Sequence, residues 1–78
     1  MMLDSDQIRA IIEESVKGVD IAALGDEQDF SEVGIDSLDH SMILLAVEER
    51  SSIKIPDEAV DSCASVAGIV AFLKDNQA

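Results

Sequence analysis

The sequence is poor in the residue types that hold many small domains together. Its 78 residues include one cysteine, one proline, two phenylalanines and no tryptophan or tyrosine. The single cysteine, Cys63, cannot form an intramolecular disulfide or a zinc site, so neither can stabilise the chain. A core must therefore come mainly from aliphatic side chains, which contribute about 1.5–3 kcal/mol each when a large one is fully buried.

Basic residues are scarce as well. Five Lys and Arg stand against seventeen Asp and Glu, which gives a net charge of −12 at pH 7. Such a surface repels nucleic-acid phosphates and anionic membranes, and it favours protein partners that carry basic patches. On charge alone, the alternative that the acidic residues serve only solubility stays open.

Long apolar runs are absent too. The longest, residues 66–73, is too short to span a bilayer, and the first residues lack the basic and apolar regions of a signal peptide. We therefore expect a cytoplasmic monomer without membrane insertion. The acidic stretch over residues 26–39 lacks the glycine and the glutamate that a calcium loop needs, so no metal site is expected.

Apolar periodicity predicts an all-α chain that forms a single domain over residues 1–78. Residues 6–17 carry isoleucine and valine at the spacing of one helix face, with Asp4 and Gln7 resembling a capping box and Gly18 suited to the helix end. Residues 19–36 show no sustained period. They predict a long loop anchored in the core by Ile21, Leu24, Phe30 and Val33, and an ordered loop of this length is usually functional.

Three further helices are predicted after this loop. The second helix should begin at Asp36, which can cap the free N–H groups of the first turn, and end near Ser51. Pro56 suits the opening of a short helix over residues 57–62, and Ser65 suits the cap of a last helix. The expected fold is a small four-helix bundle of three main helices plus one short helix, with a long loop between helices one and two.

The most informative stretch is Gly34-Ile35-Asp36-Ser37-Leu38-Asp39. It places Ser37 in the first turn of a helix, directly after a capping aspartate. The serine side chain should therefore be exposed. The free N–H groups and positive dipole end of the helix favour a phosphate attached there. On local chemistry alone, however, a serine in a first turn is most often ordinary helix-start chemistry.

Residues 30–38, Phe-Ser-Glu-Val-Gly-Ile-Asp-Ser-Leu, resemble the phosphopantetheine attachment signature of acyl carrier proteins. The likeness continues through Ala46-Val47-Glu48-Glu49 and Ile55-Pro56-Asp57-Glu58 and covers about residues 5–75 in the family's helix order. It implies that a phosphopantetheinyl transferase attaches 4'-phosphopantetheine from coenzyme A to Ser37. It also implies that acyl groups are held as thioesters on this arm and that the domain is not an enzyme.

The resemblance further implies that the second helix is the recognition surface for acyl-transferring and chain-elongating enzymes with basic patches. The residues expected on that surface by position are Asp36, Leu38, Asp39, Met42, Glu48, Glu49, Asp57, Glu58 and Asp61. Met42 and Arg50 stand where the family often has acidic residues, and Ser51 replaces a usual core aromatic. Because of these departures, both general fatty-acid synthesis and a specialised lipid, polyketide or aminoacyl pathway stay open.

Aliphatic packing among the main helices could open a cleft for an acyl chain. The residues whose helix faces suggest that they line it are Met42, Ile43, Ala46, Ile55, Val60, Ala64 and Val66. A different class of function, an acidic helical adaptor without a prosthetic group, is the alternative. Hydrolysis is disfavoured because His40, although three residues after Ser37, lacks a third orienting group and a nucleophile elbow. We expect His40 to be exposed and Cys63 to be buried.

Overall fold

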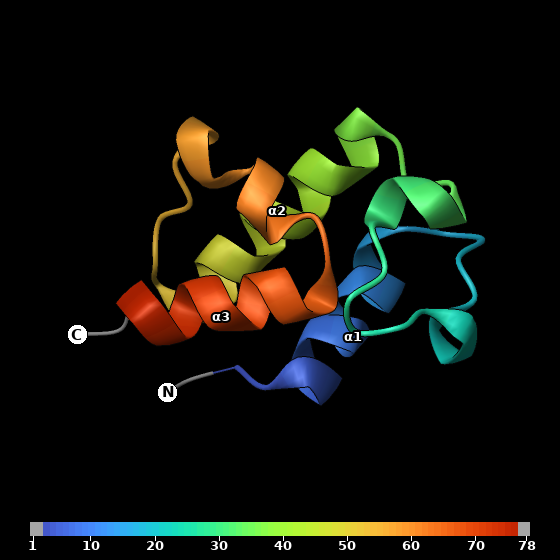
Figure 1. Cartoon of the computed structure of the whole chain (residues 1–78), viewed down its shortest axis with the longest axis horizontal. Coiled ribbons are helices and arrows are strands. Elements are labelled where there is room, and N and C mark those ends of the chain that lie inside the picture. The colour runs from blue at the N-terminus through green and yellow to red at the C-terminus, as the bar shows by residue number, and fades with distance from the viewer. Residues whose placement is uncertain (1–2, 77–78) are drawn as a thin grey trace.

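The computed structural model describes residues 3–76, and within them every regular element is helical (Figure 1). The α-helices are α1 (Ser5–Ser15), α2 (Ser37–Ser51) and α3 (Val66–Asn76). Short 3-10 turns, η1 (Ile21–Ala23), η2 (Phe30–Val33), η3 (Asp57–Ala59) and η4 (Asp61–Cys63), lie in the connections. The all-α prediction, with three main helices and a long first loop, is confirmed.

The short helix predicted over residues 57–62 is two successive 3-10 turns rather than one α-helix. The backbone hydrogen bonds run between residues three apart, as from the Cys63 N–H to the Val60 oxygen at 3.0 Å. Neither η3 nor η4 has a side-chain cap. An uncapped segment of this length gains little from α-helix propagation, and 3-10 turns are common in such short connectors.

The start of α1 follows from its first residues. The Gln7 N–H donates to the Asp4 carboxylate and the Asp4 N–H donates to the Gln7 side-chain oxygen, each at 2.9 Å. This reciprocal pair is the predicted capping box, and it satisfies two donors that the helix end leaves free. Gly18, with φ of 84°, lies two residues beyond the end cap at Val16. It therefore turns the chain into the loop rather than capping the helix.

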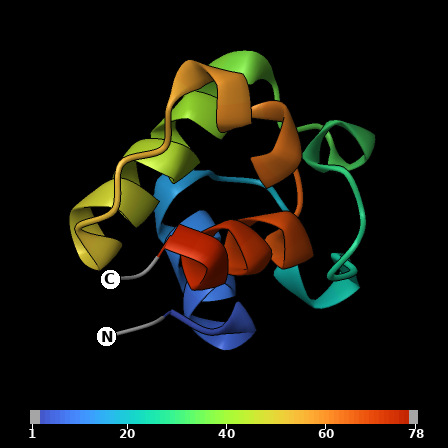
Figure 2. The ribbon, with the colours of Figure 1, turned by 60° about the vertical axis from the view of Figure 1, so that its left-hand side comes forward.

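The core is aliphatic, as the composition requires, with Phe30 as its aromatic member. Its buried residues are Leu3, Ile8, Ile11, Ile12, Val16, Leu24, Phe30, Ile35, Ile43, Leu44, Val47, Ile55, Cys63, Val66, Ile69 and Leu73. Helix α1 packs against both α2 and α3, and η3 and η4 cross from the end of α2 to the start of α3 (Figure 2). Of the predicted loop anchors, Leu24 and Phe30 are buried, whereas Ile21 and Val33 are half-buried against the core.

Candidate functional site

Ser37 is the first residue of α2, and its side chain is exposed. The Asp36 carboxylate caps the helix by accepting from the Asp39 N–H at 2.8 Å, and the Asp36 backbone oxygen accepts from the His40 N–H at 2.9 Å. The N–H groups of Ser37 and Leu38 have no acceptor within residues 3–76. The predicted exposed serine at a capped helix start is therefore confirmed, beside free donors that suit a phosphate.

The turn before Ser37 is held in place by the residues that precede it. Gly34 ends η2 in the left-handed conformation, with φ of 87°, which glycine adopts without strain. The next residue, Ile35, is buried, and its N–H donates to the Phe30 oxygen at 3.1 Å. Because Ile35 is held in the core and Asp36 caps α2, Ser37 is presented outward from a well-supported turn.

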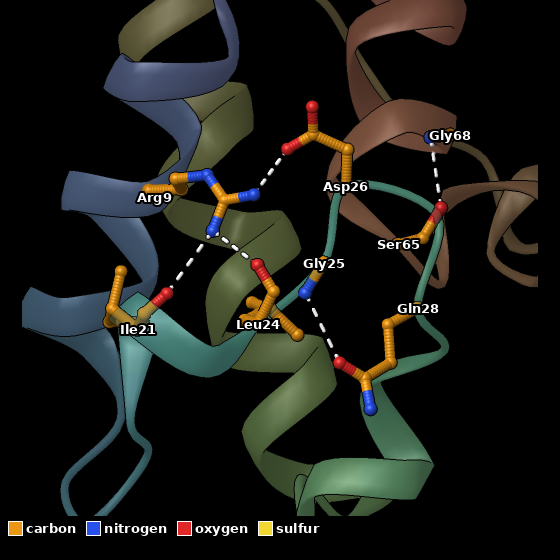
Figure 3. A network of polar contacts seen from close by, with 8 residues as sticks. All are labelled: Arg9, Ile21, Leu24, Gly25, Asp26, Gln28, Ser65 and Gly68. Carbon is orange, nitrogen blue, oxygen red and sulfur yellow. Dashed lines mark hydrogen bonds and ion pairs between the residues drawn. The ribbon is translucent and has the colours of Figure 1, made fainter.

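The long first loop is fastened to α1 by Arg9. Its guanidinium donates to the backbone oxygens of Ile21 at 3.2 Å and Leu24 at 2.5 Å, and forms an ion pair with the Asp26 carboxylate (Figure 3). The planar fork of arginine suits several acceptors at once. Sequence reasoning missed Arg9, because nothing local to it indicates that loop carbonyls more than ten residues away fold over it.

The same loop is also tied to the start of α3. The Ala67 N–H donates to the Asp26 backbone oxygen at 2.7 Å, and the Phe30 N–H donates to the Ala64 oxygen at 2.8 Å. These bonds lie on either side of Ser65, whose hydroxyl accepts from the Gly68 N–H at 3.0 Å (Figure 3). Ser65 is thus the predicted cap of α3, and the loop that leads to Ser37 is braced by both α1 and α3.

The outer face of α2 carries an apolar stripe that begins next to Ser37. Leu38, Met42 and Leu45 are 70%, 45% and 56% exposed, and their spacing places them on one side of the helix. The partner surface predicted from the sequence includes Leu38 and Met42 but not Leu45. The acidic residues predicted for the same surface are mostly exposed: Asp36, Glu49, Asp57, Glu58 and Asp61 are exposed, and Asp39 is half-buried.

Glu48, also expected on the partner surface, has a role inside the protein. Its carboxylate accepts from the Ile55 N–H at 2.6 Å, and the side chain is half-buried. This bond ties the end of α2 to the segment that leads into η3. A charge-assisted bond of this kind is stronger than a neutral one, so Glu48 helps to set the spacing between α2 and η3.

A surface hollow of about 280 Å³ lies between α2 and η3. It is lined by Ser41, Leu44, Leu45, Glu48, Ile55, Asp57 and Val60. Of the residues predicted to line an acyl cleft, Ile55 and Val60 lie here, and Met42 is exposed on the neighbouring stripe. Ala46 and Ala64 are half-buried. Ile43 and Val66 are fully buried in the core, so they would contact cargo only if the core opened.

His40 is not exposed as expected. It is half-buried, its Nε2 lies 2.9 Å from the Cys63 backbone oxygen, and its ring meets Phe30 edge-on with 5.5 Å between ring centroids. The exposed-histidine prediction is wrong because η4 packs close enough to α2 to engage the ring. Cys63 itself is fully buried as predicted, and burial raises the pKa of its thiol, which disfavours a reactive thiolate.

Residues 3–76 contain no cluster of three or more side chains able to hold a metal ion. None of the helices within them is long and apolar enough to cross a membrane.

Comparison with known proteins identifies the family of the chain. Residues 6–73 match the family described as "Phosphopantetheine attachment site". The chain is 36% identical over 73 residues to proteins named "Acyl carrier protein" from Helicobacter pylori strain J99 and Helicobacter acinonychis strain Sheeba, covering 92% of this chain and 92% of each relative. It is 49% identical over 45 residues to "Acyl carrier protein, mitochondrial" of Dictyostelium discoideum, which covers 58% of this chain and 38% of that protein. The chain therefore belongs to the acyl carrier protein family, whose members are non-catalytic carriers that use phosphopantetheine.

Proposed function

We propose that Ser37 is the attachment residue for 4'-phosphopantetheine and that this protein carries acyl intermediates as thioesters on that arm. The observation that carries the proposal is the exposed Ser37 hydroxyl at the capped start of α2, beside N–H groups without acceptors. In the attachment step, the Ser37 oxygen attacks the coenzyme A phosphorus that bears the pantetheine. The bond to the second phosphate breaks, adenosine 3',5'-bisphosphate leaves, and the serine proton passes to a base of the transferase or to water.

Some groups around Ser37 favour a phosphodiester at this position, and others disfavour it. The free N–H groups and the positive dipole end of α2 favour the negative charge. The carboxylates of Asp36 and Asp39 repel this charge. The hydrogen bond that the Asp36 carboxylate accepts from the Asp39 N–H partly offsets its own charge. This chain therefore supplies the acceptor hydroxyl and some of the phosphate binding, and the transferase must bring the cations.

Partner enzymes dock, in this proposal, on α2 and the neighbouring turns. The apolar stripe of Leu38, Met42 and Leu45 fits an apolar depression on the partner, and the surrounding carboxylates fit a basic rim. Complementary charges raise the rate of encounter, and they weaken as salt rises. Added salt should therefore lower the rate of association with these enzymes, while the apolar contacts in the complex remain.

The hollow between α2 and η3 is the proposed resting place of the cargo. Ser37, Ser41, Leu44 and Glu48 follow one face of α2, so the hollow begins one turn beyond the attachment residue. Its far end at Glu48 is about 16 Å from Ser37 along the helix, at 1.5 Å per residue. The leucine, isoleucine and valine side chains that line it suit an aliphatic acyl chain, and Ser41, Glu48 and Asp57 make part of its lining polar.

The family's usual role is fatty-acid biosynthesis, and we propose delivery of acyl chains to enzymes of that pathway or of a related lipid or polyketide pathway. The alternatives are an aminoacyl or peptidyl carrier of a specialised pathway and an acidic adaptor without a prosthetic group. Family membership favours the acyl carrier.

The test is to load the purified protein and measure its intact mass. The protein is incubated with coenzyme A, magnesium and a broad-specificity phosphopantetheinyl transferase. We expect one addition equal to the arm in the wild type and none in Ser37→Ala. Ser41→Ala is the matched control, because Ser41 is also exposed on α2 but lies one turn further along, and it should load normally. If the wild type gained no mass, the carrier function would be refuted and the adaptor without a prosthetic group would be favoured.

A further inference from the structure

A second hollow lies between α3 and the start of α1. It has a volume of about 480 Å³, and its lining includes Asp4, Asp26, Ala67, Val70, Ala71 and Lys74. In Figures 1 and 2 the start of α1 is at the lower side of the molecule, whereas the first turn of α2 is at the upper side. A molecule bound in this hollow would therefore leave the attachment turn uncovered.

The α3 side of this hollow is a short face made mainly of small and apolar side chains. The residues on this face, at helical spacings of three and four, are Ala67, Val70, Ala71 and Lys74. Ala67 and Val70 are half-buried, and Ala71 is exposed. The distance between two packed helices depends on the side chains at the contact. Alanine in two successive turns therefore lets another helix approach α3 closely.

The two ends of this face carry opposite charges. The Ala67 N–H donates to the Asp26 backbone oxygen at 2.7 Å, so Asp26 lies at the first end. Lys74 lies seven residues after Ala67, about 10 Å further along the helix axis. Its side chain is exposed and forms no ion pair within residues 3–76. One Asp26 carboxylate oxygen pairs with Arg9, and Figure 3 shows the other directed away from Arg9.

This arrangement of charges is complementary to itself. In a two-fold symmetric contact, residue i of one copy meets residue j of the other, and j meets i. If two α3 helices pack antiparallel about an axis between Val70 and Ala71, Lys74 of each copy lies over Ala67 of the other. Each lysine then meets Asp26 of the other copy. The contact therefore forms two identical ion pairs, one at each end of an apolar centre.

We propose that this α3 face is a self-association surface on which two copies of the chain pair weakly and antiparallel, in place of the monomer expected from the sequence. Exposed ion pairs contribute little free energy, and a net charge of −12 on each copy opposes pairing, so high protein concentration is needed. At about 0.15 M salt, repulsion beyond roughly 8 Å is largely screened, whereas pairs buried in a contact are screened much less. The pair would present both Ser37 residues to partner enzymes.

Sedimentation equilibrium of the full chain at about 0.15 M salt tests the proposal. In the wild type we expect the apparent mass to rise from one chain towards two as the protein reaches millimolar concentration. In Lys74→Glu it should stay at one chain, because a glutamate would then face Asp26 of the other copy. The matched control is Lys17→Glu, which changes the net charge equally at an exposed residue outside the hollow and should associate like the wild type.

Concentration-dependent ¹⁵N–¹H NMR shifts locate the contact. We expect the amide signals of Ala67 and Ala71 to shift with concentration and those of Leu38 and Leu45 to stay in place. The last two report on the apolar stripe of α2, which is the competing face for self-association. Ala71→Arg, which fills the hollow from an exposed position, should abolish both the mass increase and the shifts. The spectrum of each dilute variant checks that it is folded.

Four outcomes overturn the proposal. A wild type that stays at one chain would show that the surface does not pair. Lys74→Glu that associates like the wild type would show that the ion pairs do not hold the contact. Loss of association in Lys17→Glu would show that net charge controls it, and shifts in the stripe of α2 would show that another face is used. Should Lys74→Glu fail to fold, Ala71→Arg still decides. None of these results depends on the loading of Ser37, so a failure of the proposed function is separate.

Discussion

Replacing Gly68 with alanine tests how closely η4 packs on α3. A Cβ atom at this position would lie 2.1 Å from the Ser62 backbone oxygen and 3.3 Å from its carbonyl carbon. Because the obstacle is backbone, no side-chain rotation relieves the overlap. Either η4 moves away from α3 or the first turn of α3 is displaced, together with its cap at Ser65.

Two effects of opposite sign set the magnitude. Within an α-helix, alanine is favoured over glycine by about 1 kcal/mol. Overpacking a close contact costs typically about 1–3 kcal/mol, and an overlap this deep belongs in the upper part of that range. We therefore expect Gly68→Ala to lower the free energy of unfolding by roughly 1–2 kcal/mol. For a domain of this size that corresponds to a fall in Tm of about 4–8 °C per kcal/mol.

Urea denaturation followed by circular dichroism measures the change. Gly25→Ala is the control, because a Cβ there would meet only the Gln28 side chain at ordinary contact distance, 3.7 Å. It should leave stability unchanged or raise it slightly, by reducing the entropy of the unfolded chain. If Gly68→Ala were more stable than the wild type, as helix propensity alone predicts, the close packing of η4 on α3 would be refuted.

Three other predictions concern the loop and the surface. Arg9→Ala should lower the free energy of unfolding by about 1–3 kcal/mol in urea denaturation, because it leaves carbonyls without their charged donor. Arg9→Lys should recover only part of this lost stability, and full recovery would contradict a role for the planar guanidinium of arginine. The hydroxyl and the N–H of Ser31 donate hydrogen bonds to the Asp29 carboxylate and lower its pKa. These bonds therefore stabilise the fold fully at a pH above the usual carboxyl pKa, and this stabilisation is lost as the pH falls through the lowered pKa of Asp29. Ser31→Ala should raise the Asp29 pKa in a carboxyl NMR titration, and an unchanged pKa would contradict the assignment. With 17 acidic and 5 basic residues, the folded chain repels itself, so added salt should raise the Tm at neutral pH, and a flat response in calorimetry would refute this account.

The helix starts could be predicted because their causes are local. The side chains of Asp4, Asp36 and Ser65 each accept a hydrogen bond from the backbone N–H three residues further along. The residues that predict each cap and the hydrogen bond that forms it therefore lie in the same short stretch of sequence. The same holds for Ser37, whose exposure follows from its place directly after a cap. Apolar periodicity likewise predicted the buried face of α1.

The missed features depend on segments that meet only in the folded chain. Arg9 binds carbonyls 12 and 15 residues away, and Glu48 binds an N–H seven residues away across a turn. His40 looked exposed because helical spacing places it near Ser37, but it faces η4, 23 residues further along. The two 3-10 turns replaced a predicted helix because Cys63 must reach the core from a short, uncapped segment.

These long-range contacts bear on function because Ser37 itself makes few contacts. Its position is set by Asp36 and the buried Ile35, and these in turn depend on the loop that Arg9 fastens to α1 and that the backbone ties to the start of α3. The start of α3 carries Gly68, against which η4 packs, and η4 carries the oxygen that holds His40. The attachment turn and the η4 segment are thus supported by one connected set of contacts. A change at Gly68 should therefore act first on the packing of η4, whereas a change at Arg9 should act first on the presentation of Ser37.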